Sequence, residues 1–253
     1  MVFVLALAAA CGDDDDGDDA ADATPTPVHW AYEGEAGPDN WGELSPDFAA
    51  CAEGDEQSPI DLTPAEPQDL PDIVFDYEPS KLAIQNNGHT IQANYEPGSS
   101  ISVGDESYEL IQFHFHAHSE HTLDGESFPL EMHLVHRDDG GRLAVVGVML
   151  EEGAANDAFE AVFENLPVEE SEQAEAVDGA TVDALQLLPT KKSYVAYQGS
   201  LTTPPCSEGV SWYVLSEPVK LSEDQIESFT EIFENNFRPT QPLGDREVLL
   251  DED

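Results

Sequence analysis

Histidines gather in one short stretch of the chain, where residues 112–136 hold six of the eight. Two of them, His114 and His116, are separated by one residue, so in a β-strand they project from the same face about 6.5–7 Å apart. His133 follows 17 residues later, on a second expected strand that can return beside the first. Neutral imidazoles that converge in this way are typical ligands of Zn²⁺, so the spacing predicts a metal site.

The composition of this stretch also indicates what the metal would do. Structural zinc sites usually complete their shell with cysteine, and no cysteine lies nearby. The fourth position on the metal would then be left to a water molecule. The metal would lower the pKa of that water to about 7, which is typical of a catalytic zinc site. Gln112 and Glu131 each stand two residues before a ligand on the same strand face, where they can hold the second ring nitrogens of His114 and His133.

The alternative is a pair of histidine-rich strands whose imidazoles are satisfied without a metal. His-x-His alone is a common pattern, but a third histidine with two matched partners is much rarer. Three further histidines fit the structural interpretation better: His118, His121 and His136.

The elements that must position these residues are mostly strands. Apolar runs and alternation predict strands over residues 108–116, 131–137, 143–150, 194–197 and 210–215. Helices are few: Asn156 can cap one that carries Phe159, Val162, Phe163 and Leu166, and Ser222 with Gln225 forms a capping box before Ile226, Phe229, Ile232 and Phe233. With no internal linker, residues 28–253 are expected to form a single domain, mainly β with short helices (α+β), around a large sheet.

Ten motifs, in the same order along the chain, resemble those of the alpha-class carbonic anhydrases of the exported bacterial type. They cover His29–Tyr32, Gly37–Trp41, Gln57–Asp61, Asn86–His89, Gln112–His116, Ser119–Thr122, Glu131–His136, Gly199–Pro205, Val210–Trp212 and Arg238–Leu243. The resemblance implies one central, mostly antiparallel twisted sheet. It also implies a zinc enzyme that reversibly hydrates carbon dioxide to bicarbonate and a proton, through attack by a zinc-bound hydroxide.

The resemblance assigns roles to individual residues. It makes His114, His116 and His133 the zinc ligands, and it makes Thr202 a gate whose hydroxyl donates to Glu120. The substrate pocket would comprise Val135, Val145, Leu201, Thr203, Val210 and Trp212. His89 would be the proton shuttle, next to a water path lined by Tyr32, Asn87 and Gln92. Without the resemblance, His89 would be interpreted as a turn residue after Asn-Gly.

Cysteine usage indicates export. The chain has Cys11, Cys51 and Cys206, and if Cys11 carries lipid, one pair remains. The resemblance places Cys51 and Cys206 at a disulfide of bacterial members, and such a bond fits an oxidising compartment. The alternative is two free buried thiols.

The N-terminus predicts a targeting segment. Residues 1–11 form an apolar run that is too short to span a membrane and ends at Cys11, like a lipoprotein signal. Residues 12–27 are rich in Asp, Ala, Thr and Pro, which predicts a flexible acidic tether. The expectation is an exported protein, periplasmic or at the cell surface, tethered to the membrane through lipid on Cys11. A plain secretory signal is the alternative.

The charge balance is extreme, with 54 acidic and 8 basic residues and a formal net charge of −46. From Ala23 onward 47 acidic residues remain, so the acidity belongs to the domain and not only to the tether. Nucleic acid is excluded as a partner, and adaptation to high salt is favoured over an ordinary acidic secreted protein. Two other functions stay open at this point: a binding module that shares the fold, and a zinc esterase that shares the site.

Overall fold

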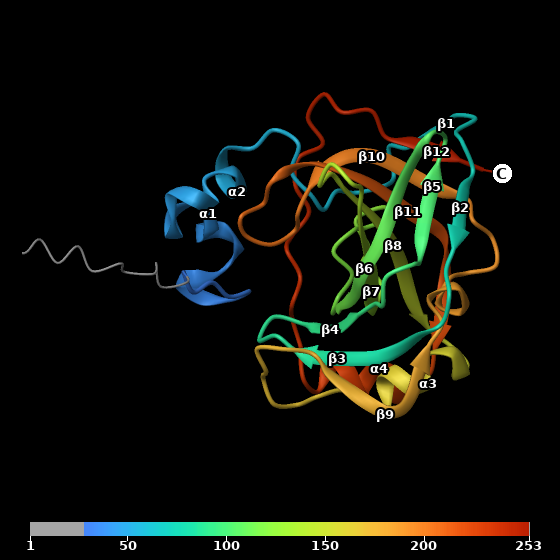
Figure 1. The fold of residues 1–253 in the computed structure, drawn as a ribbon. Coiled ribbons are helices and arrows are strands. Elements are labelled where there is room, and N and C mark those ends of the chain that lie inside the picture. Colours follow the sequence, from blue (N-terminus) through green and yellow to red (C-terminus); the bar gives the residue numbers. More distant parts are fainter. Residues whose placement is uncertain (1–27, 253) are drawn as a thin grey trace, which may run out of the picture.

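A computed structural model describes residues 28–252, and Figure 1 shows the arrangement of the elements. The predicted signal (residues 1–11), the predicted tether (residues 12–27) and Cys11 lie outside the described residues. Twelve strands form one large sheet. They are β1 (Glu66–Pro67), β2 (Ile73–Asp76), β3 (Ser80–Asn86), β4 (Ile91–Asn94), β5 (Ser100–Val103), β6 (Glu106–His116), β7 (Leu130–Arg137), β8 (Leu143–Glu152), β9 (Glu175–Val182), β10 (Tyr194–Ser200), β11 (Glu208–Leu221) and β12 (Leu249–Asp251).

The strand order along the sheet is β1-β12-β10-β11-β8-β7-β6-β4-β3-β9, and β5 pairs with β2 and β6 off this path. The predicted large, mostly antiparallel sheet is confirmed, and two of its pairings are parallel. β8 pairs with β11 in parallel, as does β1 with β12. Parallel neighbours need a long crossover, and here the chain passes through three short helical segments, β9 and β10 between β8 and β11.

Alternation along the central strands sends side chains to two faces. On β7, Met132 and Leu134 enter the larger hydrophobic core, while His133 and Val135 point to the opposite face. β8 follows the same rule, with Val146 in the larger core and Val145 in the smaller one. The histidines therefore lie on the face that carries the smaller apolar cluster.

Short helices flank this sheet: α1 (Trp41–Leu44), α2 (Ala50–Glu53), α3 (Glu160–Phe163) and α4 (Glu223–Thr230). Single 3₁₀ turns occupy Gly34–Ala36, Pro38–Asn40, Pro46–Phe48, Asp157–Phe159 and Ala184–Leu187. The capping box of Ser222 and Gln225 is confirmed at the start of α4. Asn156 accepts from the backbone N–H of Ala158, but its helix ends at Phe163, before Leu166. Pro167 explains the early end, because the residue before a proline is disfavoured in helical geometry.

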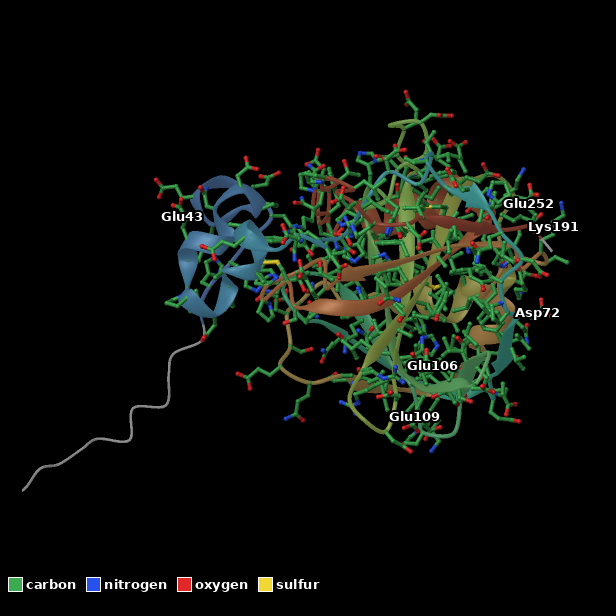
Figure 2. All side chains as sticks on the ribbon, turned by 90° about the horizontal axis from the view of Figure 1, so that it is seen from above. Glu43, Asp72, Glu106, Glu109, Lys191 and Glu252 are labelled. Carbon is green, nitrogen blue, oxygen red and sulfur yellow. A yellow bond between two sulfur atoms is a disulfide. The ribbon has the colours of Figure 1, made fainter. Side chains whose placement is uncertain are left out.

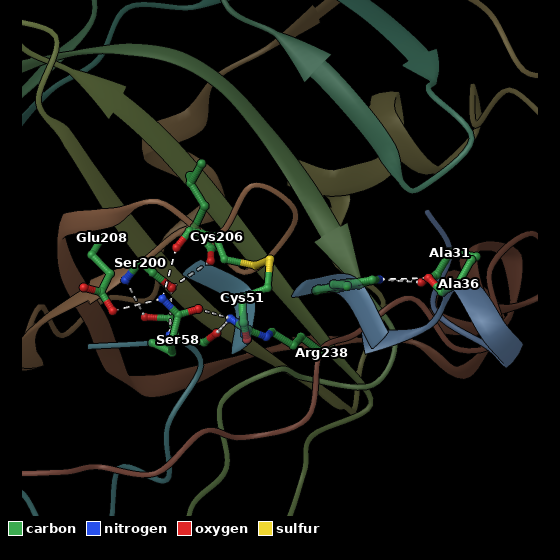
Figure 3. Close-up of a disulfide and its surroundings, with 11 residues drawn as sticks. Ala31, Ala36, Cys51, Ser58, Ser200, Cys206, Glu208 and Arg238 are labelled. Carbon is green, nitrogen blue, oxygen red and sulfur yellow. Dashed lines mark hydrogen bonds between the residues drawn. A yellow bond between two sulfur atoms is a disulfide. The ribbon is translucent and has the colours of Figure 1, made fainter. Parts of the chain in front are cut away.

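The N-terminal segment, residues 28–53, has a small aromatic core of its own and is joined to the rest of the domain through Cys51. Trp41 is fully buried and packs with Trp30 and Tyr32. A disulfide joins Cys51 to Cys206, which confirms the predicted pairing, and Figure 3 shows it with Arg238 beside Cys51. The buried Arg238 guanidinium donates to the carbonyl of Cys51 at 2.8 Å and lies 5.7 Å from the Trp41 ring.

Candidate metal centre

The pairing of β6 with β7 brings the three histidines together. His114 lies directly opposite His133, and His116 projects from the same face of β6. The ring centroids are 5.0 Å apart for His114 and His116, 5.3 Å for His114 and His133, and 4.6 Å for His116 and His133. One nitrogen from each ring lies within 4.8 Å of the other two. This geometry can hold one metal ion.

Each ring is oriented by a partner on its other nitrogen. His114 donates from Nδ1 to Gln112 Oε1 at 2.9 Å, and His133 donates from Nε2 to Glu131 Oε1 at 2.8 Å. These are the two partners expected from the i−2 spacing. His116 donates from Nδ1 to the backbone carbonyl of Asn236 at 2.7 Å. The lone pairs of His114 Nε2, His116 Nε2 and His133 Nδ1 are therefore left for a shared ligand.

Two observations test whether a zinc ion fits this site. Among the described residues, His116 Nε2 is buried without any hydrogen-bonding partner, a situation that is costly unless another group occupies the position. Burial also lowers the pKa of all three imidazoles, that of His116 to about 4, with the neighbouring histidines adding to the effect at His114. The rings are therefore neutral at pH 7, the form that binds a metal, so the residues fit Zn²⁺.

Glu131 is the centre of a second layer beneath the ligands. Besides His133, its Oε1 accepts from His121 Nδ1 at 2.7 Å, and its Oε2 accepts from the backbone N–H groups of Glu120 and His121 at 2.8 and 2.9 Å. Burial alone would raise the pKa of Glu131, but His121 and His133 hold it well below its usual range. Gly147 leaves room for this carboxylate, because a Cβ there would lie 3.1 Å from Oε1. His121, which the sequence pattern left without a role, thus supports the centre.

Glu120 and Thr202 lie together at the edge of the histidine cluster. Glu120 is buried; its Oε1 accepts from the backbone N–H of Arg238 at 2.8 Å, and its Oε2 lies 3.9 Å from His133 Nδ1. Burial raises the pKa of Glu120 to about 7, while His133, Arg238 and the Thr202 hydroxyl limit the rise. The Thr202 hydroxyl is thus close enough to affect the Glu120 carboxylate, as the predicted hydrogen bond requires, while Glu120 Oε2 has no hydrogen-bonding partner among the described residues.

The residues predicted to line a substrate pocket gather in the smaller apolar cluster. It contains Val135, Val145, Leu201, Val210 and Trp212, together with Phe128 and Leu143, which the sequence analysis did not single out. The Trp212 ring lies 4.8 Å from the His133 ring, so this apolar surface adjoins the metal centre. Thr203 is half-buried and accepts from the Cys206 backbone N–H at 2.8 Å through its carbonyl.

His89 lies in the turn between β3 and β4. The side-chain oxygen Oδ1 of Asn87 accepts from the backbone N–H groups of His89 and Thr90, so Asn87 shapes the turn that carries His89. The His89 ring stacks on Trp30 with centroids 3.7 Å apart. Burial lowers its pKa, His29 lowers it further, and Glu170 opposes both.

The other two residues of the predicted water path, Tyr32 and Gln92, lie in different surroundings. Tyr32 packs against Trp30 and Trp41, and burial, followed by the charge of Glu120, raises its pKa well above the usual value. Gln92 pairs with His114 in the sheet and donates to Asn94 at 2.7 Å. The structure therefore brings Tyr32 near the carboxylate at the centre and Gln92 beside a predicted ligand.

Comparisons with known proteins agree with this geometry. Residues 36–252 match the family model of the eukaryotic-type carbonic anhydrases. A carbonic anhydrase from Nostoc sp. is 44% identical over 227 residues, which cover 88% of this chain and 86% of that protein. The alpha-carbonic anhydrase of Thermovibrio ammonificans, solved with the inhibitor sulfanilamide, has 41% identity and a TM-score of 0.84, covering 88% of this chain and all of that one. A hyperthermostable carbonic anhydrase from a hydrothermal vent chimney has 46% identity and the same TM-score and coverage.

Proposed function

The chain belongs to the alpha, or eukaryotic-type, carbonic anhydrase family, and from that premise we propose that it hydrates carbon dioxide reversibly with a Zn²⁺ held by His114, His116 and His133. The observation that carries the proposal is the donor set. Three buried neutral imidazoles converge, each has its outward nitrogen occupied, and the inward nitrogen of His116 has no partner among the described residues. When bound there, Zn²⁺ would lower the pKa of a water ligand to about 7 and so supply a nucleophile at neutral pH.

The chain's own residues orient the reactants. An ionised carboxylate only accepts hydrogen bonds, so Glu120 would accept one from the Thr202 hydroxyl, and the hydroxyl oxygen would in turn accept one from a group on the metal side. This alignment requires the ionised form of Glu120. The pKa of about 7 that burial imposes would fall again beside a divalent cation, because an opposite charge favours the carboxylate.

The apolar wall suits an uncharged substrate. Val135, Val145 and Trp212 offer carbon dioxide a dry surface next to the ligands, and such a substrate needs no cationic clamp. The Thermovibrio relative was solved with sulfanilamide, and we expect the same inhibitor to bind this chain.

His89 would carry the proton away. A water of pKa about 7 loses its proton to bulk water at no more than about 10³ per second, if recombination is diffusion-limited near 10¹⁰ M⁻¹s⁻¹. Turnover near 10⁶ per second, as in other zinc sites of this kind, needs a relay. Imidazole suits the task because its ordinary pKa is about 6.5.

We also propose an exported, lipid-anchored protein. The support is the apolar run that ends at Cys11 and the disulfide between Cys51 and Cys206, which fits an oxidising compartment. No helix within residues 28–252 has the length and apolar character needed to cross a membrane. Mass spectrometry of the mature N-terminus tests the anchor, and an unmodified N-terminus at another residue would refute it.

Metal analysis combined with one substitution tests the function. We expect about one zinc per chain and carbon dioxide hydration that sulfanilamide inhibits. His133→Ala should lose the zinc and reduce hydration below detection, because two imidazoles cannot complete the site. His118→Ala is the matched control, since His118 is exposed and outside the cluster, and it should keep both. Near-UV circular dichroism checks that the variants fold, and full hydration by zinc-free protein would refute the proposal.

A further inference from the structure

An acidic loop, residues 164–174, is hydrogen-bonded to Asn86 at the start of the turn that carries His89. The loop precedes β9 and lies beside the β3–β4 turn at the left of Figure 1. Asn86 makes both connections: its Nδ2 donates to the Val168 carbonyl at 3.1 Å, and its carbonyl accepts from the Ser171 backbone N–H at 2.8 Å. A parallel bridge pairs Asn86 with Glu170 between these two contacts. The backbone of Glu170 is therefore fixed relative to the turn.

The Glu170 carboxylate lies directly against that turn. A Cβ added to Gly88 would come within 3.4 Å of its Cδ and Oε2, and Gly88 also has a φ of +84°, which side chains disfavour. Gly88 thus allows a close approach between the carboxylate and the residue before His89. The stacking of the His89 ring on Trp30 fixes the other member of the pair.

We propose that Glu170 is a positioning residue of the proton path. It stabilises the imidazolium of His89 and so sets how readily His89 accepts a proton. The proton leaves the water of the metal centre, adds to the neutral imidazole of His89, and then passes to a buffer molecule, which restores the neutral ring. Glu170 neither gives nor takes a proton in these steps and acts only through its charge. The catalytic consequence rests on the proposed function, whereas the coupling between Glu170 and His89 does not.

The need for such a group follows from the surroundings of His89. Burial and the neighbouring His29 both disfavour the imidazolium, and Glu170 opposes them. A ring that binds protons too weakly would be a poor acceptor for a donor of pKa about 7. The Glu170 carboxylate raises the proton affinity of His89 and so brings it closer to that of the water at the metal centre.

The direct test is an NMR titration of the His89 ring in the full-length protein, with His89→Ala used to assign the resonance. In Glu170→Gln the pKa of His89 should fall by roughly 0.3–0.7 unit at low salt, because Glu170 is exposed and an ion pair with an exposed partner is weak. The difference should shrink in 1 M NaCl because the charge is screened. Glu170→Asp keeps the charge and should leave the pKa of His89 between those of the wild type and Glu170→Gln. Glu252→Gln removes the same charge near the C-terminus, which Figure 1 shows on the opposite side of the molecule, and should change nothing.

The kinetic test compares kcat with kcat/KM for hydration in weak buffer. Glu170→Gln should lower kcat about twofold, following the lower proton affinity of His89, and leave kcat/KM unchanged. Added imidazole should restore kcat. An unchanged titration of His89, or a shifted titration with unchanged kcat, would overturn the proposal. A shifted titration in a chain without zinc and without carbon dioxide hydration would refute the proposed function and leave the pair intact.

Discussion

At the residue scale, His136 shows how one buried imidazole ties stability to pH. It lies on β7 but faces away from the metal centre, fully buried, with Nε2 2.7 Å from the Tyr77 hydroxyl. Burial lowers its pKa to about 3, whereas the unfolded chain would titrate near the ordinary value of 6.5. Between these two values the unfolded state binds more protons than the folded state. The contribution of His136 is therefore complete above pH 6.5 and is lost progressively as the pH falls toward 3.

Replacing this residue should flatten the pH dependence. We expect His136→Gln to be less stable at neutral pH, because it loses packing and a buried hydrogen bond. Between pH 6 and 4 the free energy of unfolding should fall more slowly with pH in this variant than in the wild type, by about 1.4 kcal/mol per pH unit. Urea unfolding at several pH values measures both effects. As a control, Tyr77→Phe removes the hydrogen bond but keeps the titrating His136 ring, so it should keep the wild-type dependence on pH. Equal slopes of unfolding free energy against pH for His136→Gln and wild type would contradict the interpretation.

The site could be predicted from sequence where its partners lie close together in the chain. His114 with Gln112 and His133 with Glu131 follow the two-residue period of a strand, so their hydrogen bonds were predictable. The partner of His116 is the backbone carbonyl of Asn236, 120 residues away, and every residue has such a carbonyl. No residue type marks it, so only the folded chain identifies it. The support that His121 gives to Glu131 was hidden for a similar reason, since it depends on how the loop before β7 folds back.

At the element scale, the disulfide joins α2 to the loop between β10 and β11. Cys51 and Cys206 are 155 residues apart, and Figure 3 shows their bond among the hydrogen bonds of Ser58, Ser200 and Glu208. A cross-link over a loop of this length restricts the unfolded chain strongly, by about 5 kcal/mol in the chain-entropy model. That value is an upper estimate because the unfolded chain keeps some structure.

Removing this bond should destabilise the domain without changing its fold. We expect Cys51→Ala with Cys206→Ala to lower the free energy of unfolding by about 2–5 kcal/mol, measured by urea titration. Dithiothreitol should have the same effect on the wild type and none on the double variant, which serves as the control. Two reactive thiols at Cys51 and Cys206 in native, unreduced protein would contradict the bond.

The strands were more predictable than their order. Apolar runs located β6, β7, β8, β10 and β11, because alternation and continuous hydrophobicity are local signals. The parallel pairing of β8 with β11 is not local, since Val145 lies beside Trp212 across 67 residues of chain. The helix after Asn156 was predicted too long, because the apolar period continues to Leu166 while Pro167 ends the helical geometry.

At the scale of the whole molecule, acidic side chains surround the domain. Figure 2 shows carboxylate oxygens around the outline of the molecule in that view, among them those of Glu43, Asp72 and Glu252. Eight basic residues cannot neutralise 54 acidic ones. Among the described residues the surface ion pairs of lysine and arginine are confined to Lys81, Arg142 and Lys220. Repulsion between carboxylates therefore opposes folding, and salt should relieve it.

Stability should consequently rise with ionic strength. We expect the free energy of unfolding to increase steadily from 0.05 to 2 M KCl, where the Debye length falls from above 10 Å to below 3 Å. Sucrose, which raises osmolality without adding ions, separates screening from solvent exclusion. A variant with glutamine or asparagine at Glu169, Glu172, Glu175 and Asp178 should depend less on KCl. Equal stability at both ends of the KCl range would refute the proposed adaptation to salt.

The attachment of the N-terminal segment has a consequence for the order of events during synthesis. Cys51 is held by Cys206 and by Arg238, and the second contact spans 187 residues. The ribosome makes about 5–20 residues per second, so some 10–40 s pass between the synthesis of Cys51 and that of Arg238. Throughout that interval Trp41 lacks the guanidinium that covers it in the finished protein. The first part of the domain to be made therefore cannot complete its contacts until nearly all of the chain has been made.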